Sequence, residues 1–378
     1  MKKTVQLMQK LRHINSGSLL RKRLYGAIFL ATAISLGACH KDDNNIGSTP
    51  AKYEGGFFIA NEGWFGHENG DLHFYTYAGD SLQTSVYKKE NPADSLGKPS
   101  NSLEFATVFN NKMYIVVKAG GPLVATDVRT MKETGRAASL PKNDGHAFVG
   151  IDQYRGLLST GDGVYPVSLT TLSIDKKVDS ISGYVGDMIV AGKYAFALSQ
   201  TDGIVAINTA DYKFAKRFGK ANQGFAISKD GTVWAATSDS LISINPATLE
   251  RTGFKSGFTV SSPWGAWRHA SISASTKENV IFISPGAGFS GGTKVYRYMI
   301  GDPTSLAQPF ITLPTGQYFY GSAIGYNKST NEIIALTING SITGNINRVL
   351  FYDASTGELK KTVTYNGWYF PAMPVFLQ

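Results

Sequence analysis

The sequence predicts an all-β protein built from repeated four-stranded units. Three observations indicate this class: the composition, the near absence of helical periodicity, and the recurrence of short β-rich runs. Glycine is abundant, at 41 of 378 residues, and it is accompanied by 19 tyrosines and 21 phenylalanines. Charged residues make up only 17% of the chain. This mixture is typical of a large β protein with many turns and well-filled sheets.

The β-rich runs recur every 38 to 57 residues. Each is bounded by Gly, Asn, Asp or Ser and is followed by a turn and a second strand-like run. Several of these second runs end in Asp or Asn, such as Asp127 and Asp353, and we expect such side chains to cap tight turns rather than bind metal. Aligned on one residue each, the seven runs contain Phe57, Tyr114, Leu157, Ala195, Val233, Val280 and Ile333.

Seven repeats of about 47 residues, each with roughly four strands, predict a seven-bladed β-propeller over residues 53–378. The two ends of this segment favour ring closure. Residues 371–377 resemble a first strand that has no blade of its own, and the run at Gly56 lacks such a strand. Pairing the N- and C-terminal strands would complete the closing blade and cover two open sheet edges. Six or eight blades remain alternatives, because the repeats are only weakly similar.

The first 38 residues have the three parts of a secretory signal peptide. Seven basic and no acidic residues precede Cys39, and an apolar stretch runs from Leu24 to Leu36. That stretch is too short to span a bilayer, which takes about 20 apolar residues. The sequence Leu36-Gly37-Ala38-Cys39 resembles the bacterial lipobox, in which the cysteine becomes the lipidated first residue. We therefore expect lipidation of Cys39 and a polar tether over residues 39–52; an ordinary cleaved signal with a chance cysteine is the alternative.

The residues after Cys39 bear on where the protein is located. Lys41, Asp42 and Asp43 resemble the lipoprotein export signal of Bacteroidetes, which directs lipoproteins to the outer face of the outer membrane. A solvated charge cluster in a linker is the alternative. We expect a lipid-anchored protein of the outer membrane that faces the cell exterior. Without the leader, 30 basic and 28 acidic residues remain, so net charge does not indicate nucleic-acid binding.

In a propeller, the loops between the second and third strands share one face with the connections between blades. Here these loops are rich in aromatic residues, whereas loops are usually polar. We interpret them as a rigid apolar binding face, with histidines and amides such as Asn222 and Gln223 at its rim. The alternative is that the rings plug the channel or pack between blades. The expected ligand-binding residues are Trp64, Phe65, His67, His146, Trp264, Trp267, Arg268, His269, Phe289, Tyr318, Tyr320, Trp368 and Tyr369.

Motifs for catalysis or metal binding are weak. The five histidines after Cys39 are scattered without zinc-site spacing, and no further cysteine is present for a disulfide or a thiolate site. Residues 286–291 match a GxGxxG pattern and Ser290 lies in a GxSxG match, but a strand rather than a helix is expected to follow. Glu62 and Glu68 are the only acids in the richest loop, which is thin support for acid–base catalysis. We expect a non-enzymatic protein with no metal and no cofactor of its own.

Two stretches of the sequence resemble a known family. Residues 56–66 (GFFIANEGWFG) and 69–75 (NGDLHFY) resemble the start of the surface-exposed β-propeller lipoproteins of Bacteroidetes, which are related to YncE-like and YVTN-type propellers. That group includes the BtuG lipoproteins, which bind cobalamin and pass it to a TonB-dependent transporter of the outer membrane. The resemblance implies capture of a large amphipathic small molecule, best a corrinoid, for such a transporter. A protein-interaction or glycan-binding accessory propeller is the alternative.

Overall fold

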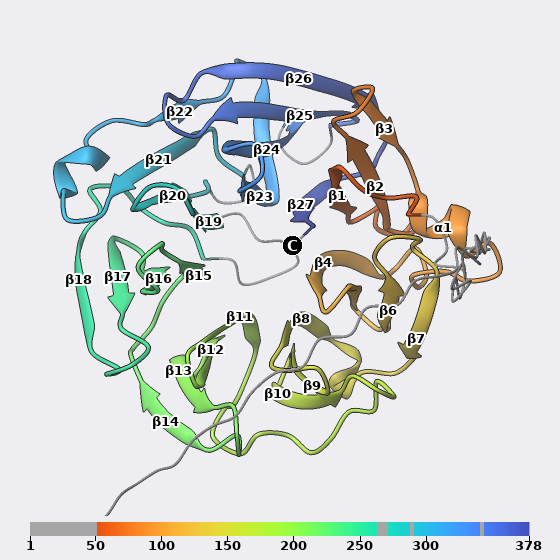
Figure 1. Cartoon of the computed structure of the whole chain (residues 1–378), viewed down its shortest axis with the longest axis horizontal. Coiled ribbons are helices and arrows are strands. Elements are labelled where there is room, and N and C mark those ends of the chain that lie inside the picture. Colours follow the sequence, from red (N-terminus) through yellow and green to blue (C-terminus); the bar gives the residue numbers. More distant parts are fainter. Residues whose placement is uncertain (1–50, 263–270, 288–290, 341–343, 378) are drawn as a thin grey trace, which may run out of the picture. The chain divides into compact units, whose positions relative to one another are not determined.

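A computed structural model describes residues 51–262, 271–287, 291–340 and 344–377. In this part of the chain, seven antiparallel sheets are arranged in a ring around a central axis (Figure 1). The predicted seven-bladed β-propeller is confirmed. No helix among these residues is long and apolar enough to cross a membrane.

Each blade runs outward from an innermost strand at the axis. The first four blades contain β27 (Pro371–Phe376), β1 (Gly56–Asn61), β2 (Asp71–Thr76) and β3 (Ser81–Gln83); β4 (Ser102–Phe109), β5 (Lys112–Lys118), β6 (Leu123–Asp127) and β7 (Glu133–Ala137); β8 (Gly145–Gly150), β9 (Arg155–Thr160) and β10 (Gly163–Ser168); and β11 (Val185–Ala191), β12 (Tyr194–Ser199), β13 (Gly203–Asn208) and β14 (Phe214–Arg217).

The other three blades have four strands each, and three short helices lie in connections. The strands are β15 (Gln223–Ile227), β16 (Val233–Ala236), β17 (Ser240–Ile244) and β18 (Arg251–Lys255); β19 (Ser271–Ala274), β20 (Val280–Ser284), β21 (Lys294–Met299) and β22 (Ile311–Thr312); and β23 (Gln317–Asn327), β24 (Glu332–Asn339), β25 (Ile346–Asp353) and β26 (Leu359–Asn366). The helices are α1 (Val86–Glu90), η1 (Pro141–Asn143) and η2 (Pro303–Leu306).

The seven runs aligned in the sequence all form the second strand of a blade: β1, β5, β9, β12, β16, β20 and β24. Nearly every residue in these strands is buried, as in β1 and β20. A second strand packs against neighbouring blades on both faces, so it reads as a continuous apolar run rather than an alternating one. The turn residues also behave as expected, since Asp127 Oδ1 accepts the N–H groups of Arg129 and Thr130.

Two features depart from regular four-stranded repeats. The third blade has three strands, and an isolated bridge between Val167 and Ile174 takes the place of a fourth. The longest repeat contains α1 between β3 and β4. The carboxylate of Asp71, at the start of β2, accepts the N–H groups of Tyr87 and Lys88 and so fixes α1 to the first blade.

The ring closes through the two ends of the propeller. Strand β27 pairs antiparallel with β1, in a register that runs from Phe57 opposite Phe376 to Asn61 opposite Pro371. The first blade is therefore completed by the C-terminal strand, as the sequence predicted, and β27 lies beside the axis (Figure 1). Phe57 packs against Phe351 of the last blade, with ring centroids 6.0 Å apart.

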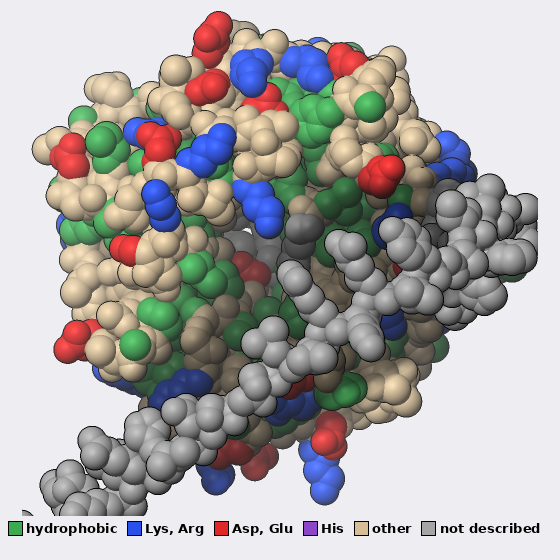
Figure 2. Space-filling view, viewed as in Figure 1, with side chains coloured by type: hydrophobic (Ala, Val, Ile, Leu, Met, Phe, Trp, Pro, Cys, Tyr) green, Lys and Arg blue, Asp and Glu red, His purple; other side chains and the backbone are tan. Residues whose placement is uncertain are grey.

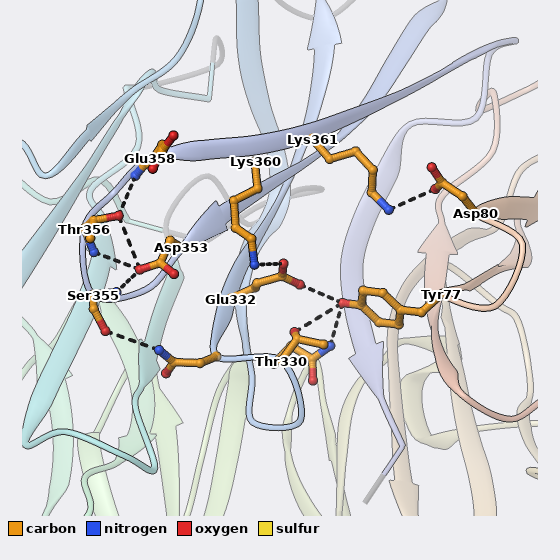
Figure 3. A network of polar contacts seen from close by, with 12 residues as sticks. Tyr77, Asp80, Thr330, Glu332, Asp353, Ser355, Thr356, Glu358, Lys360 and Lys361 are labelled. Atoms are coloured by element: carbon orange, nitrogen blue, oxygen red, sulfur yellow. Dashed lines mark hydrogen bonds and ion pairs between the residues drawn. The ribbon is translucent and has the colours of Figure 1, made fainter.

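Polar contacts hold the first blade to the last one at the periphery (Figure 3). The hydroxyl of Tyr77 donates to Glu332 at 3.0 Å and accepts from the side-chain amide of Asn327 at 2.8 Å. Within the last blade, Lys360 of β26 forms an ion pair with the same Glu332 at 2.8 Å, and across the junction Lys361 forms one with Asp80 at 2.9 Å. The junction where the ring closes is thus joined by both aromatic packing and a charged network.

The innermost strands all start at the same face of the ring, which we call the entry face. It carries the connections between blades and the loops between second and third strands, including residues 62–70 and 367–370. Strand β1 runs toward this face, so Gly56 lies at the opposite face. There the N–H groups of Lys52 and Tyr53 donate to the carbonyl oxygen of Arg129, in the turn between β6 and β7.

Candidate functional site

Three of the predicted side chains form an aromatic stack on the entry face. The ring of Trp64 lies 3.8 Å from that of His67 and 4.9 Å from that of Trp368, with interplanar angles of 21° and 25°. Trp64 belongs to the loop after β1 and Trp368 to the loop before β27, so the closed first blade brings them together. Both tryptophans are half-buried and His67 is exposed. The stack is therefore partly open to solvent.

Buried side chains support this stack from below. Tyr320, Ile338 and Phe370 form a cluster against which Trp64 and Trp368 pack. The rings of Tyr320 and Phe370 lie 5.3 Å apart. The loops are fixed by their backbones as well, because the N–H of Glu62 donates to the carbonyl oxygen of Phe370 at 2.9 Å.

Glu62 is a buried carboxyl beneath the stack, with 4% of its surface exposed. Its Oε2 accepts the hydroxyl of Tyr320 at 2.6 Å. Burial raises the pKa of Glu62 to about 7, although the hydrogen bonds from Tyr320 and Ser102 and the charge of Lys118 act in the opposite direction. This carboxyl therefore titrates near neutral pH although it is almost wholly buried.

A cavity of about 190 Å³ lies within the ring of innermost strands. In the space-filling view, the ring is hollowed beside its axis (Figure 2). The lining comes mostly from the first residues of these strands, which places the cavity toward the entry face. Its lining residues are Glu104, Phe105, His146, Tyr184, Gly186, Asp187, Leu198, Gln223, Gly224, Phe225, Ser271, Ile272, Ser322, Ile324, Met373 and Pro374.

His146 forms part of the polar wall of this cavity. Its ring stacks on Tyr184 at 3.9 Å, and its Nδ1 lies 2.7 Å from the carbonyl oxygen of Val185. Nε2 lies 3.0 Å from Oδ2 of Asp144, although not in line with it for a hydrogen bond. Burial lowers the pKa of His146 despite the nearby carboxylate, so the ring is neutral at physiological pH.

A half-buried lysine beside this wall compensates its acidic groups. Lys118 ends β5, and its ammonium group lies 5.2 Å from the ring centroid of Tyr184. Burial alone would lower the pKa of Lys118, but the charges of Glu104 and Asp144 and the contact with Tyr184 raise it. Lys118 therefore stays charged and offsets the carboxylates near it.

Two further polar groups line the cavity from neighbouring blades. The carboxylate of Asp187 accepts the N–H groups of Met188 at 3.0 Å and Phe225 at 2.9 Å. The side chain of Gln223 is 1% exposed, and neither its Oε1 nor its Nε2 has a hydrogen-bond partner. A buried polar group without a hydrogen-bond partner lowers the stability of the fold, so Gln223 is a candidate for binding a ligand.

The remaining predicted residues are not part of the three-ring stack. Phe65 is 59% exposed in the loop after β1, and Tyr369 packs edge-on against His73 with ring centroids 4.5 Å apart. Tyr318 and Tyr320 belong to β23 rather than to a loop, next to a register shift between Phe319 and Ile324. The predicted residues Trp264, Trp267, Arg268, His269 and Phe289, and the motif serine Ser290, lie outside the described residues.

The sequence interpretation missed Glu104, Lys118, Tyr184 and Asp187. Three of them lie on strands rather than in loops, and Tyr184 directly precedes β11. Two of these residues could have been found from the sequence. Glu104 is an acid within the largely buried strand β4, and Lys118 is a base at the end of the buried run of β5. Within the described part of the chain, no group of three or more His, Cys, Asp or Glu side chains is suited to hold a metal ion.

The fold is shared with solved structures of low sequence identity. A quinonprotein alcohol dehydrogenase-like protein from Bacteroides thetaiotaomicron superposes with a TM-score of 0.69 at 18% identity, over 85% of this chain and 78% of that one. A protein from Lactobacillus plantarum gives 0.61 at 10% identity, over 85% of this chain and all of its own. A dihydro-heme d1 dehydrogenase gives 0.52 at 9% identity, over 84% and 76% of the two chains. These likenesses establish the propeller fold alone.

No curated protein matches the sequence. A family model described as a domain of unknown function, DUF5074, matches residues 55–377, and the chain therefore belongs to the DUF5074 family.

Proposed function

We propose that this protein is a non-enzymatic binding propeller that captures a large amphipathic small molecule on its entry face, with a corrinoid as the first candidate. The observation that carries the proposal is the stack of Trp64, His67 and Trp368, which is partly open to solvent and supported by buried rings. Large, rigid aromatic side chains of this kind bind flat apolar surfaces at low entropic cost.

The size of the cavity supports a ligand that rests on the face. Sites that enclose a drug-sized ligand have volumes of about 300–1,000 Å³. The central cavity measures about 190 Å³, so a macrocycle would lie across the entry face and place only a small part of itself between the strands. The polar wall around His146 would then supply directional hydrogen bonds.

The proposal includes a location outside the cytoplasm. Lipidation at Cys39 and the export signal at Lys41, Asp42 and Asp43 would hold the propeller at the outer membrane, where a transporter could receive its ligand. The second candidate function is a protein-interaction module. Phe65 favours it, because a phenylalanine ring that is 59% exposed on the same face suits contact with a partner protein.

Titration calorimetry and tryptophan fluorescence with cobalamin and cobinamide test the corrinoid proposal. We expect binding at micromolar ligand, and a loss of about tenfold in affinity for Trp64→Ala or Trp368→Ala, because each removes a stacking surface. Tyr154→Ala is the matched control, since this ring is 62% exposed in the turn between β8 and β9, at the opposite face.

Absence of heat and of quenching with both corrinoids would reject the corrinoid proposal. A glycan, or an outer-membrane protein recovered with the propeller, would replace the corrinoid if its binding is lost in Trp64→Ala but kept in Tyr154→Ala.

A further inference from the structure

We propose that the central cavity binds a primary carboxamide group, as the polar arm of the molecule held on the entry face. The inference rests on the proposed function for the rest of that molecule, but the carboxamide site itself is carried by separate observations. They are the unpartnered side chain of Gln223, the compensation of the charges around it, and the volume of the cavity.

Gln223 defines the chemistry that the cavity lacks. It is the first residue of β15, where its side chain is 1% exposed and lines the cavity. Its Oε1 has no donor and its Nε2 has no acceptor. A carboxamide buried in this way requires a partner that both donates and accepts hydrogen bonds.

The charged groups of the cavity already have compensating contacts. The charge of Glu104 acts on Lys118, and Asp187 accepts the N–H groups of Met188 and Phe225. The neutral ring of His146 lies 3.0 Å from the carboxylate of Asp144. Two more lining atoms, Oε1 of Glu104 and Nε2 of His146, are buried without a hydrogen bond. The unmet requirement is therefore for hydrogen bonds rather than for a counter-ion.

A primary carboxamide meets this requirement in one step. Its oxygen can accept from Nε2 of Gln223 while its N–H group donates to Oε1, so both orphan atoms are satisfied by a single planar group. A carboxylate could accept from Nε2 but would face Glu104 and Asp187 across the cavity. An ammonium group could donate to Oε1 but would leave Nε2 unpaired.

The cavity has room for an arm of this kind. At about 30 Å³ of liquid volume for each water, about 190 Å³ corresponds to about six water molecules. An amide with a short alkyl stem fits this space. The apolar part of the lining, including Leu198, Phe225 and Ile324, would contact the stem.

Titration of the full-length protein in detergent with propionamide tests the proposal without a corrinoid. Propionate and propylammonium serve as charged probes of similar shape. The readout is the side-chain NH₂ resonance of Gln223 in protein labelled with ¹⁵N-glutamine, assigned by its loss in Gln223→Leu. We expect saturable shifts with propionamide and at least about tenfold weaker responses to the two charged probes, since each leaves one hydrogen bond unmade.

Two variants separate recognition from folding. Gln223→Glu should lose propionamide binding and gain propylammonium binding, detected by ligand NMR, a change of preference that a merely structural residue would not produce. Gln83→Leu, on the outer strand β3, is the matched control and should bind propionamide as the unmodified protein does.

Equal responses to the three probes, or no saturation up to about 100 mM propionamide, would overturn the proposal and leave a cavity that holds water only. Propionamide binding that persists when both corrinoids fail to bind would retain the carboxamide site and reject only the corrinoid.

Discussion

The two sides of the entry face differ in the chemistry of their side chains. Where the first and last blades meet, Trp64, Trp368 and Tyr320 pack ring on ring over the buried Phe370. Where the second, third and fourth blades meet, charged and hydrogen-bonding side chains surround a cavity, with Gln223 left unpaired on the next blade. We call these the ring side and the polar side.

The difference shows that stability and hydrogen-bonded recognition depend on different parts of the same face. On the ring side, aromatic side chains of the first and last blades pack against one another. The residues that offer a binding surface therefore also stabilise the closure of the propeller. The polar side keeps an unsatisfied amide and an enclosed space, both of which reduce stability in the free protein. Functional sites commonly accept such a reduction.

The largest expected effect comes from breaking the ring side. Phe370→Ala removes the buried ring that contacts Tyr320 and Trp368, and we expect the free energy of unfolding to fall by about 3 kcal/mol. Denaturant unfolding followed by tryptophan fluorescence measures this change. The exposed Phe65→Ala is the control, with an expected effect within about 0.5 kcal/mol. Equal effects of the two variants would mean that Phe370 does not support the stack.

The next effect concerns the proton on Glu62. Its pKa is about 7 in the folded protein against an ordinary value of 4.5, so between these pH values the folded state binds more protons than the unfolded state. The free energy of unfolding should therefore fall as pH rises through this window, by up to about 3 kcal/mol from this group. Glu62→Gln should remove that component from the pH profile.

Other buried groups titrate in the same range, so the comparison must be made between variants. Burial raises the pKa of Asp71 to about 6, which acts in the same direction as Glu62, and lowers that of His73 to about 4, which acts in the opposite direction. Subtracting the profile of Glu62→Gln isolates Glu62. The exposed Glu68→Gln should follow the unmodified protein, and a parallel profile for Glu62→Gln would contradict the prediction.

The smallest effect has the opposite sign and comes from the polar side. Gln223→Leu replaces an unpaired buried amide by an apolar group of similar size, so we expect the free energy of unfolding to rise by about 1 kcal/mol. Gln317→Leu is the matched comparison, because Oε1 of Gln317 accepts a hydrogen bond from Thr337 at 3.0 Å and its loss should destabilise by about 1 kcal/mol. Destabilisation by both changes would contradict the interpretation of Gln223 as an unsatisfied buried amide.

The fold could be read from the sequence because a strand buried on both faces is a local pattern. Phe57, Val280 and Ile333 all mark such strands, and seven of them fix the number of blades. Helix α1 gave no such pattern, because it spans only five residues. It is held instead by a hydrogen bond to Asp71, which lies on strand β2. The sequence also did not predict that the third blade lacks an outer strand. An outer strand has few buried residues, so its presence or absence leaves little apolar pattern.

The candidate site was only partly predictable. Aromatic residues in loops are unusual enough to identify Trp64 and Trp368, and their stacking follows from closure of the first blade. The polar side depends on residues from different blades, such as Lys118 and Tyr184, whose proximity is set by the geometry of the ring. No spacing in the sequence encodes that proximity.

The direction of β1 has a consequence for how the protein is presented. The chain joins the propeller at Gly56, on the face opposite the stack, where Lys52 and Tyr53 are bound to Arg129. If Cys39 carries the lipid as proposed, its tether would join the propeller at the face that does not carry Trp64 and Trp368. A ligand could then reach the stack without displacing the residues through which the chain enters the fold.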